Sequence, residues 1–290
     1  MKSKQLLGIS LLLCTILIMF AGCHSESAYK VLEIGYSGTA RGAKHSTEYI
    51  FPANDKSRTP QVEPQLEGQE ASIVVGNQKF TGEYTKSVYR YRNDYQYKLY
   101  KTADGVEFSF DDTGTLSSFY SGNIEPKGEF RTEQECIEIA TSFVKPLLNL
   151  QDYTVECCQS EQLDAYEITF TKYLNGYKTS DYAEVSILYD GEVFSYHANM
   201  LGRIPADTMP DIDHDTMVEA VYQKLDEIYE EVTIYDELTY DDVDAWKFTY
   251  TVLEDGSPAM LCTMHVEFCQ AIGGGQSLAS GELENFLILL

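Results

Sequence analysis

The sequence predicts an α+β protein, in which an antiparallel β-meander is followed by two helix-plus-β-hairpin repeats. Alternating apolar residues separated by turn signals fill residues 71–125. Two later segments carry apolar residues at helical spacing, 81 residues apart, and each precedes alternating strands. A fixed spacing of this kind is typical of an internal repeat.

The first 22 residues predict an export signal that is not part of the fold. Lys2 and Lys4 precede an apolar run over residues 6–20, which is shorter than the roughly 20 residues of a membrane-spanning helix. Ala21-Gly22 before Cys23 resembles a bacterial lipoprotein signal, in which the cysteine is diacylated and becomes the mature N-terminus. This resemblance implies that Cys23 anchors an exported chain to the outer face of the bacterial cytoplasmic membrane. Ordinary secretion with cleavage nearby is the alternative.

Residues 23–70 predict a mostly irregular tether, because they are polar and interrupted by Pro52, Pro60 and Pro64. Apolar side chains alternate between residues 29 and 36, so this short part is also compatible with a strand.

Residues 71–125 predict a β-rich N-terminal unit of four or five antiparallel strands. The expected strands cover residues 72–75, 79–92, 95–101, 106–110 and 116–120, with turns at Gly76-Asn77, Asn93-Asp94 and residues 111–114. Several of these strands have one apolar face, so the sheet needs a cover.

Residues 126–204 and 205–290 predict the two repeats. Thr132 caps the first helix with Glu135 in a capping box, and Asp213 caps the second. Each helix precedes a hairpin, the first of which turns at Asn175-Gly176. The apolar residues 284–290 predict a last buried strand. The helix faces are Ile137, Ala140, Val144 and Leu147, then Val218, Val221, Leu225 and Ile228.

Short motifs in these units resemble the PepSY-like family. They are the helix opening Thr132-Glu133-Gln134-Glu135, the stretch Tyr189-Asp190-Gly191-Glu192-Val193-Phe194-Ser195-Tyr196, and in the preceding unit Thr81-Gly82-Glu83-Tyr84 and residues 110–119. The resemblance covers residues 71–270 and implies PepSY-like repeats in an exported or membrane-attached bacterial protein. It implies a protein that binds or restrains a peptidase or wall enzyme and has no catalytic residues of its own.

The charge balance limits the expected partners. The chain has 46 acidic and 21 basic side chains, a net charge of −25, which argues against nucleic acid as a partner. The acidic residues 204–255 indicate solubility outside the cell rather than a metal site. The expected partners are the membrane, through the lipid anchor, and a surface protein or cell-wall component.

A basic and aromatic hairpin is the candidate binding face, because aromatic and arginine side chains are enriched where proteins bind partners. Packing of the tyrosines into the sheet is the explanation that the pattern favours, and this hairpin is the surface expected to bind if any surface does. This Tyr-Arg hairpin comprises Tyr89, Arg90, Tyr91, Arg92, Tyr95, Tyr97 and Lys98.

No catalytic, metal or cofactor site is predicted. The spacing of three aspartates matches the start of a calcium-binding loop: Asp211, Asp213 and Asp215. Thr216 stands where such a loop requires glycine, so the favoured explanation is that these carboxylates stabilise a helix N-terminus. Two alternatives to a binding protein stay open. One is an assembly partner of an envelope enzyme, and the other is a surface hydrolase that uses Asp241, Asp242 or Asp244.

Five cysteines remain after Cys14 is lost with the signal and Cys23 is acylated. An odd number cannot pair completely, so buried free thiols are expected, with an oxygen-poor habitat or one reactive thiol as alternatives. The five, whose redox state the sequence leaves open, are Cys136, Cys157, Cys158, Cys262 and Cys269.

Overall fold

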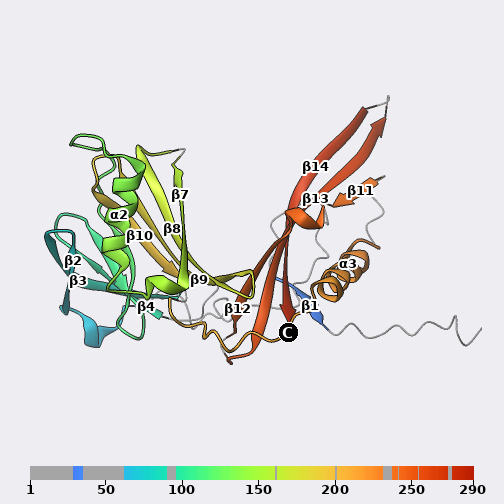
Figure 1. Ribbon diagram of the computed structural model, residues 1–290, viewed down its shortest axis with the longest axis horizontal. Coiled ribbons are helices and arrows are strands. Elements are labelled where there is room, and N and C mark those ends of the chain that lie inside the picture. Colours follow the sequence, from blue (N-terminus) through green and yellow to red (C-terminus); the bar gives the residue numbers. More distant parts are fainter. Residues whose placement is uncertain are drawn as a thin grey trace, which may run out of the picture.

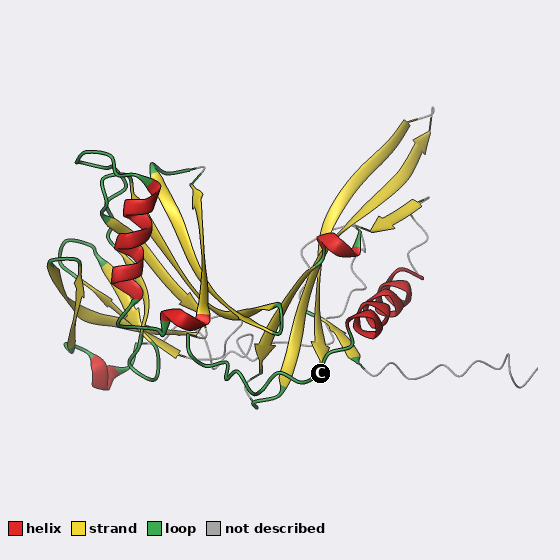
Figure 2. Cartoon of the chain, viewed as in Figure 1, coloured by secondary structure: helices red, strands yellow, loops and turns green. Residues whose placement is uncertain are grey.

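The described strands of the chain form one large mixed sheet. The computed structural model describes residues 29–34, 62–89, 96–160, 162–199, 201–230, 237–240, 242–253, 255–273 and 276–290. These ranges hold a 14-stranded sheet and two α-helices (Figures 1 and 2). The sheet is mixed, because β9 (Tyr177–Leu188) and β12 (Lys247–Val252) pair in parallel and their other pairings are antiparallel. The expected α+β arrangement with two helix-plus-hairpin repeats is therefore wrong.

The meander contains its five expected strands, which pair with one another in chain order. A two-residue turn at Gly76-Asn77 joins the first two, and Gly76 has a φ of 57°, which glycine adopts without strain. A short 3₁₀ turn, η4 (Pro64–Leu66), precedes them. The strands are β2 (Glu70–Val75), β3 (Gln78–Tyr89), β4 (Gln96–Lys101), β5 (Glu107–Phe110) and β6 (Leu116–Tyr120).

Helix α2 (Glu133–Val144) begins at the predicted capping box, which is confirmed. Four strands follow it instead of a hairpin. The unpredicted strand β7 lies at an edge of the sheet, where most of its side chains are exposed and no apolar alternation develops. After η5 (Leu150–Asp152), the strands are β7 (Tyr153–Gln159), β8 (Ala165–Leu174), β9 and β10 (Val193–Asn199).

Strand β10 connects the meander to the strands that follow α2. It pairs with β9 on one side and with β6 on the other, where Tyr196 lies opposite Phe119. Helix α2 packs on β8 and β9 and shares one hydrophobic core with the meander. Buried members of this core are Ile73, Val75, Phe108, Phe119, Cys136, Ala140, Val144, Ile168, Val185 and Tyr196.

A second core forms around α3 (His214–Glu230), whose predicted cap is confirmed because Asp213 accepts hydrogen bonds from Thr216. Strand β1 lies in the short segment of the expected tether that was also compatible with a strand, and it pairs with β14. The predicted last strand, β14, therefore lies between β1 and β13. The elements are β1 (Lys30–Glu33), β11 (Glu237–Tyr240), η6 (Val243–Ala245), β12, β13 (Pro258–Gly273) and β14 (Gln276–Leu289).

The two helix-covered parts of the sheet meet at the start of β9. Lys178 and Thr179 pair in parallel with Thr249 and Tyr250 of β12, and this is the only pairing between the two parts among the described strands. Strand β10 occupies the same edge of β9 further along. The connection therefore depends on few backbone contacts and on the side chains around them.

Asp181, two residues further along β9, organises the polar side chains at this connection. It is fully buried and accepts hydrogen bonds from the Tyr153 hydroxyl (2.6 Å) and the Gly202 amide (3.1 Å). The Lys172 ammonium lies 3.9 Å from its carboxylate and donates to the Ile204 carbonyl at 2.7 Å. Burial raises the pKa of Asp181, although these hydrogen bonds and Lys172 oppose the rise.

Arg203 joins the chain after β10 to the turn between β5 and β6. Its guanidinium donates to the Asp111 carboxylate at 2.8 Å and also contacts Asp112. Burial alone raises the pKa of Asp111, but hydrogen bonds from Thr113, Arg203 and Thr115 together hold this pKa below its ordinary value of 3.8.

We expect the stabilising effect of the Asp111 carboxylate to disappear in acid. Because its pKa is lower in the folded state, its contribution is complete above pH 3.8 and is lost as the pH falls through the lowered value. Urea unfolding of the wild type and of Asp111→Asn checks this. The difference in stability between them should narrow below about pH 4, and a constant difference would contradict the assignment.

Replacing Thr132 by alanine should lower the free energy of unfolding by about 1 kcal/mol, because α2 loses its N-cap. The Thr132 hydroxyl accepts from the Glu135 amide at 3.3 Å, and the Glu135 carboxylate accepts from the Thr132 amide at 2.8 Å. Urea denaturation measures the loss. Thr132→Ser is the control, since its hydroxyl caps in the same way, and equal losses in both variants would contradict the prediction.

Candidate binding groove

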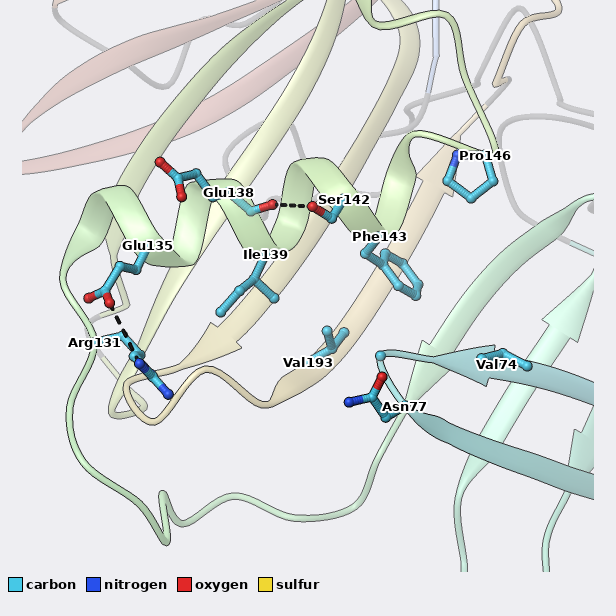
Figure 3. A pocket seen from close by; sticks show the side chains of 11 residues that line it. Val74, Asn77, Arg131, Glu135, Glu138, Ile139, Ser142, Phe143, Pro146 and Val193 are labelled. Atoms are coloured by element: carbon cyan, nitrogen blue, oxygen red, sulfur yellow. Dashed lines mark hydrogen bonds and ion pairs between the residues drawn. The ribbon is translucent and has the colours of Figure 1, made fainter.

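A groove with a cavity volume of about 580 Å³ lies between α2 and the turn that joins β2 to β3 (Figure 3). Ligand pockets usually measure about 300 to 1,000 Å³, so the groove has room for a ligand or for several side chains of a partner. Its lining consists of Val74, Gly76, Asn77, Arg131, Glu135, Glu138, Ile139, Ser142, Phe143, Pro146 and Val193.

The helical period of α2 separates the groove side chains from the core side chains. Glu135, Ile139 and Phe143 recur every four residues and line the groove. The sequence predicted another face of this helix, with Ala140 and Val144 in its apolar stripe, and did not single out the side chains that face the groove. The neighbouring stripe, buried in the core, is Cys136, Ala140 and Val144.

The apolar part of the groove is held in place by its neighbours. Ile139 and Phe143 point toward Val193 at the start of β10 (Figure 3). The Phe143 ring packs edge-on against Tyr196, with 5.2 Å between the ring centroids. Gly191 has a φ of 92°, and a Cβ atom there would lie 3.0 Å from Ile139, so the turn before β10 requires glycine.

The rim of the groove along α2 is acidic. Two glutamates of the helix, Glu135 and Glu138, line the groove, and the helix carries no lysine or arginine. Hydrogen bonds from the amide and then the hydroxyl of Thr132 lower the pKa of Glu135, and Arg131 lies 3.6 Å from its carboxylate. Glu138 accepts a hydrogen bond from Gln134 at 3.2 Å. The Glu135 carboxylate is therefore charged near neutral pH.

The structure shows only part of the predicted Tyr-Arg hairpin. Tyr89 ends β3, and Tyr97 and Lys98 lie on β4. Tyr97 is 5% exposed and packs within the sheet, while Lys98 is half-buried. The groove lies at the other end of β3, 12 residues or about 40 Å away along an extended strand. Arg90, Tyr91, Arg92 and Tyr95 lie outside the described residues.

The acidic clusters noted in the sequence form no metal site in the described part of the chain, where no group of three ligand side chains converges. Hydrogen bonds from Thr216 lower the pKa of Asp213, as expected for a helix cap. Asp242 and Asp244 are exposed beside η6, and Asp241 lies outside the described residues.

Four of the five cysteines have described side chains, and all four are free thiols. Cys136 and Cys262 are buried, which confirms the expectation for these two, whereas Cys158 is exposed. Burial raises the pKa of Cys262 to about 12 and that of Cys157 to about 11, so neither is a ready nucleophile. The side chain of Cys269 is outside the described set.

Cys23 and the predicted export signal lie outside the described residues. Neither α2 nor α3 is long and apolar enough to cross a bilayer, and the same is true of every helix in the ranges given above.

The fold and the groove define a β-sheet protein with a candidate binding site. Residues 74–200, from β2 to the end of β10, match the model of the family DUF4901, described as the YcdB, YcdC repeated domain. Every residue that lines the groove lies within this match. The description as a repeated domain agrees with the internal repeat predicted from the sequence.

Other comparisons add little to this family match. No curated protein matches the chain. A crystal structure of an uncharacterized protein from Eubacterium rectale covers 70% of this chain and 73% of its own, with 10% identity and a TM-score of 0.36.

Proposed function

We propose that the protein is an extracytoplasmic binding protein, held at the outer face of the bacterial cytoplasmic membrane by a diacylated Cys23. Its binding site is the groove along α2, and its partner is a peptidase or a wall enzyme that it binds or restrains. The observation that carries this proposal is the groove itself, which combines apolar side chains, an acidic rim and a rigid backing.

The construction of the groove supports a binding role. Binding sites with little movement lose less entropy when the partner binds. Here α2 is capped at Thr132 and buried along one face, and β10 is paired on both sides. The apolar side chains Ile139, Phe143 and Val193 offer contact area, and the glutamates on the rim select for charge.

The PepSY-like resemblance supports the choice of partner. Its helix opening, at Thr132, forms the start of α2, and its Asp190-Gly191 turn lies beneath Ile139. Glu135 from the helix opening and Val193 from the stretch that contains this turn line the groove. A domain that restrains an enzyme through this part would be inactive by itself and would act only through binding.

The test is cross-linking of the full chain to its neighbours in the envelope of the cells that make it, followed by purification and identification of the partners. Ser142→Trp places a bulky side chain in the groove from an exposed position. Gln134→Trp is the matched control, because Gln134 is exposed on the same helix and does not line the groove. A partner lost only in Ser142→Trp supports the proposal, and identical partners in both variants contradict it.

A second variant in the same experiment examines the predicted Tyr-Arg hairpin. If a partner is lost when Arg90 and Arg92 are both replaced by alanine but is retained in Ser142→Trp, the binding face lies at that hairpin. The groove would then not be the site.

Replacing Cys23 by serine should release the protein from the membrane fraction, because serine cannot be diacylated at this position. One acyl chain alone gives marginal membrane binding, whereas two anchor a protein stably. Membrane and soluble fractions are compared by immunoblotting. Unchanged membrane partitioning of Cys23→Ser would contradict the proposed anchor.

A further inference from the structure

Strand β2 has an open edge. Among the described strands it pairs only with β3, and it ends the order of the sheet. In a two-residue hairpin turn, the two residues that flank the turn exchange backbone hydrogen bonds, and in an antiparallel pair every second residue then does the same. On β2 the residues whose backbone groups bond to β3 are therefore Val75, Ile73 and Ala71. The hydrogen bond from the Tyr84 amide to the Gln69 carbonyl fits this pattern. The amides and carbonyls of the alternate residues therefore point away from the sheet; these residues are Glu70, Ser72 and Val74.

This open edge adjoins the groove. Val74 and Gly76 line the groove together with α2, whereas no residue of β3 does so. In Figure 3 the strand that carries Val74 lies on the helix side of the hairpin. A chain laid along β2 would therefore run between this strand and α2.

We infer that the groove binds an extended, basic peptide segment, which adds to the sheet as a new strand beside β2. This inference rests on the proposed function and specifies the chemistry of the partner. Main-chain hydrogen bonds to Ser72 and Val74 would supply affinity, as in other cases of strand addition. Side chains would supply the specificity.

The charges around the groove favour a basic segment. Glu135 and Glu138 of α2 line the groove and Glu70 on β2 is exposed, whereas Arg131 also lines the groove and lies near Glu135. A second copy of this chain would bring its own net charge of −25 to the same place, so edge-to-edge pairing of two copies is disfavoured. Lysine and arginine side chains on the partner would find complementary carboxylates.

The apolar side chains set the pattern of the segment. Side chains of a strand alternate between the two faces of the sheet, and residues two apart are separated by about 7 Å. Ile139 and Phe143 line the groove and also pack against the core that contains Ile73 and Val75, so side chains of the added strand on that face would meet them. The recognised segment should therefore carry apolar residues at alternate positions, with basic residues among the others.

A library of random ten-residue peptides, selected against the full chain, tests this inference. The selected peptides should show apolar residues at alternate positions and an excess of lysine and arginine. Val74→Pro removes one outward amide and leaves the ladder with β3 intact, because proline is tolerated at strand edges. We expect it to weaken binding of the selected peptides about tenfold, and more than Val74→Thr, which changes the same side chain but keeps the amide.

Three results would overturn the inference. They are the selection of no peptide, the selection of acidic or non-alternating peptides, and equal binding to Val74→Pro and Val74→Thr. The cross-linking experiment with Ser142→Trp is independent of strand addition. A partner lost in Ser142→Trp but retained in Val74→Pro would therefore refute strand addition and leave the proposed function standing.

Discussion

Replacing Phe108 by alanine should lower the free energy of unfolding by about 4 kcal/mol. Phe108 lies on β5 and is fully buried in the core that α2 shares with the meander. Its ring stacks on Tyr100 at 5.7 Å between centroids and packs edge-on against Phe110 at 5.9 Å. Alanine removes these ring contacts and leaves a cavity that neighbouring strands cannot fill without breaking their pairing.

Urea denaturation followed by circular dichroism measures this loss, with two controls. Phe108→Leu keeps most of the volume and should cost less than about 2 kcal/mol. Phe130→Ala removes the same atoms from a side chain that is 69% exposed, and should cost less than about 1 kcal/mol. Equal losses in the two alanine variants would show that Phe108 has no special place in the core.

Replacing Asp181 by alanine should cost about 3 kcal/mol, because removing one member of a buried charged pair leaves the other uncompensated. The Lys172 side chain is only 13% exposed. It would keep its hydrogen bond to the Ile204 carbonyl but lose the neighbouring Asp181 carboxylate. The Tyr153 hydroxyl and the Gly202 amide would each lose an acceptor. These groups come from β7, from β8 and from the chain after β10, so the loss should loosen the connection between the two cores.

Two measurements distinguish this effect from general destabilisation. Urea unfolding gives the total loss, with exposed Asp244→Ala as a control that should stay within about 0.5 kcal/mol. Limited proteolysis should show faster cleavage of Asp181→Ala within residues 201–213, ahead of global unfolding. If the free energy of unfolding falls but the cleavage rate within residues 201–213 is unchanged, Asp181 stabilises the fold as a whole and does not order residues 201–213.

Local features of the fold could be predicted from the sequence. The capping box at Thr132 and the turns at Gly76-Asn77 and Asn175-Gly176 depend on neighbouring residues, so their signals are contained in a few positions. The same is true of the cap at Asp213, whose hydrogen bonds stay within the first turn of α3.

Pairings between distant segments could not be predicted. Phe119 and Tyr196 lie opposite each other on β6 and β10, but 77 residues separate them and neither position carries a sign of its partner. Likewise, no sequence signal indicates the parallel pairing of Thr249 with Lys178. These pairings turn a meander and two expected repeats into a single sheet.

The groove escaped prediction for the same reason. Its lining comes from β2 and the turn after it, from α2 and its flanking residues, and from β10, which are far apart in the sequence. The sequence drew attention to the Tyr-Arg hairpin because its tyrosines and arginines are conspicuous, whereas Val74 and Ser142 are unremarkable until their neighbours are known. A binding site made of common residues has no local signature.

The position of β14 has a consequence for the order in which the parts of the chain can fold. This strand ends one residue before the end of the given sequence, yet it lies between β1, among the earliest described residues, and β13. Strands β2 to β6 can pair as soon as they emerge, because each neighbours the next in the chain. The α3 core is complete only when β14 is available, because β14 is the strand that pairs with β1 on one side and with β13 on the other. A chain cut short before residue 284 would keep all residues that line the groove, but it would lose the part of β14 that pairs with β1.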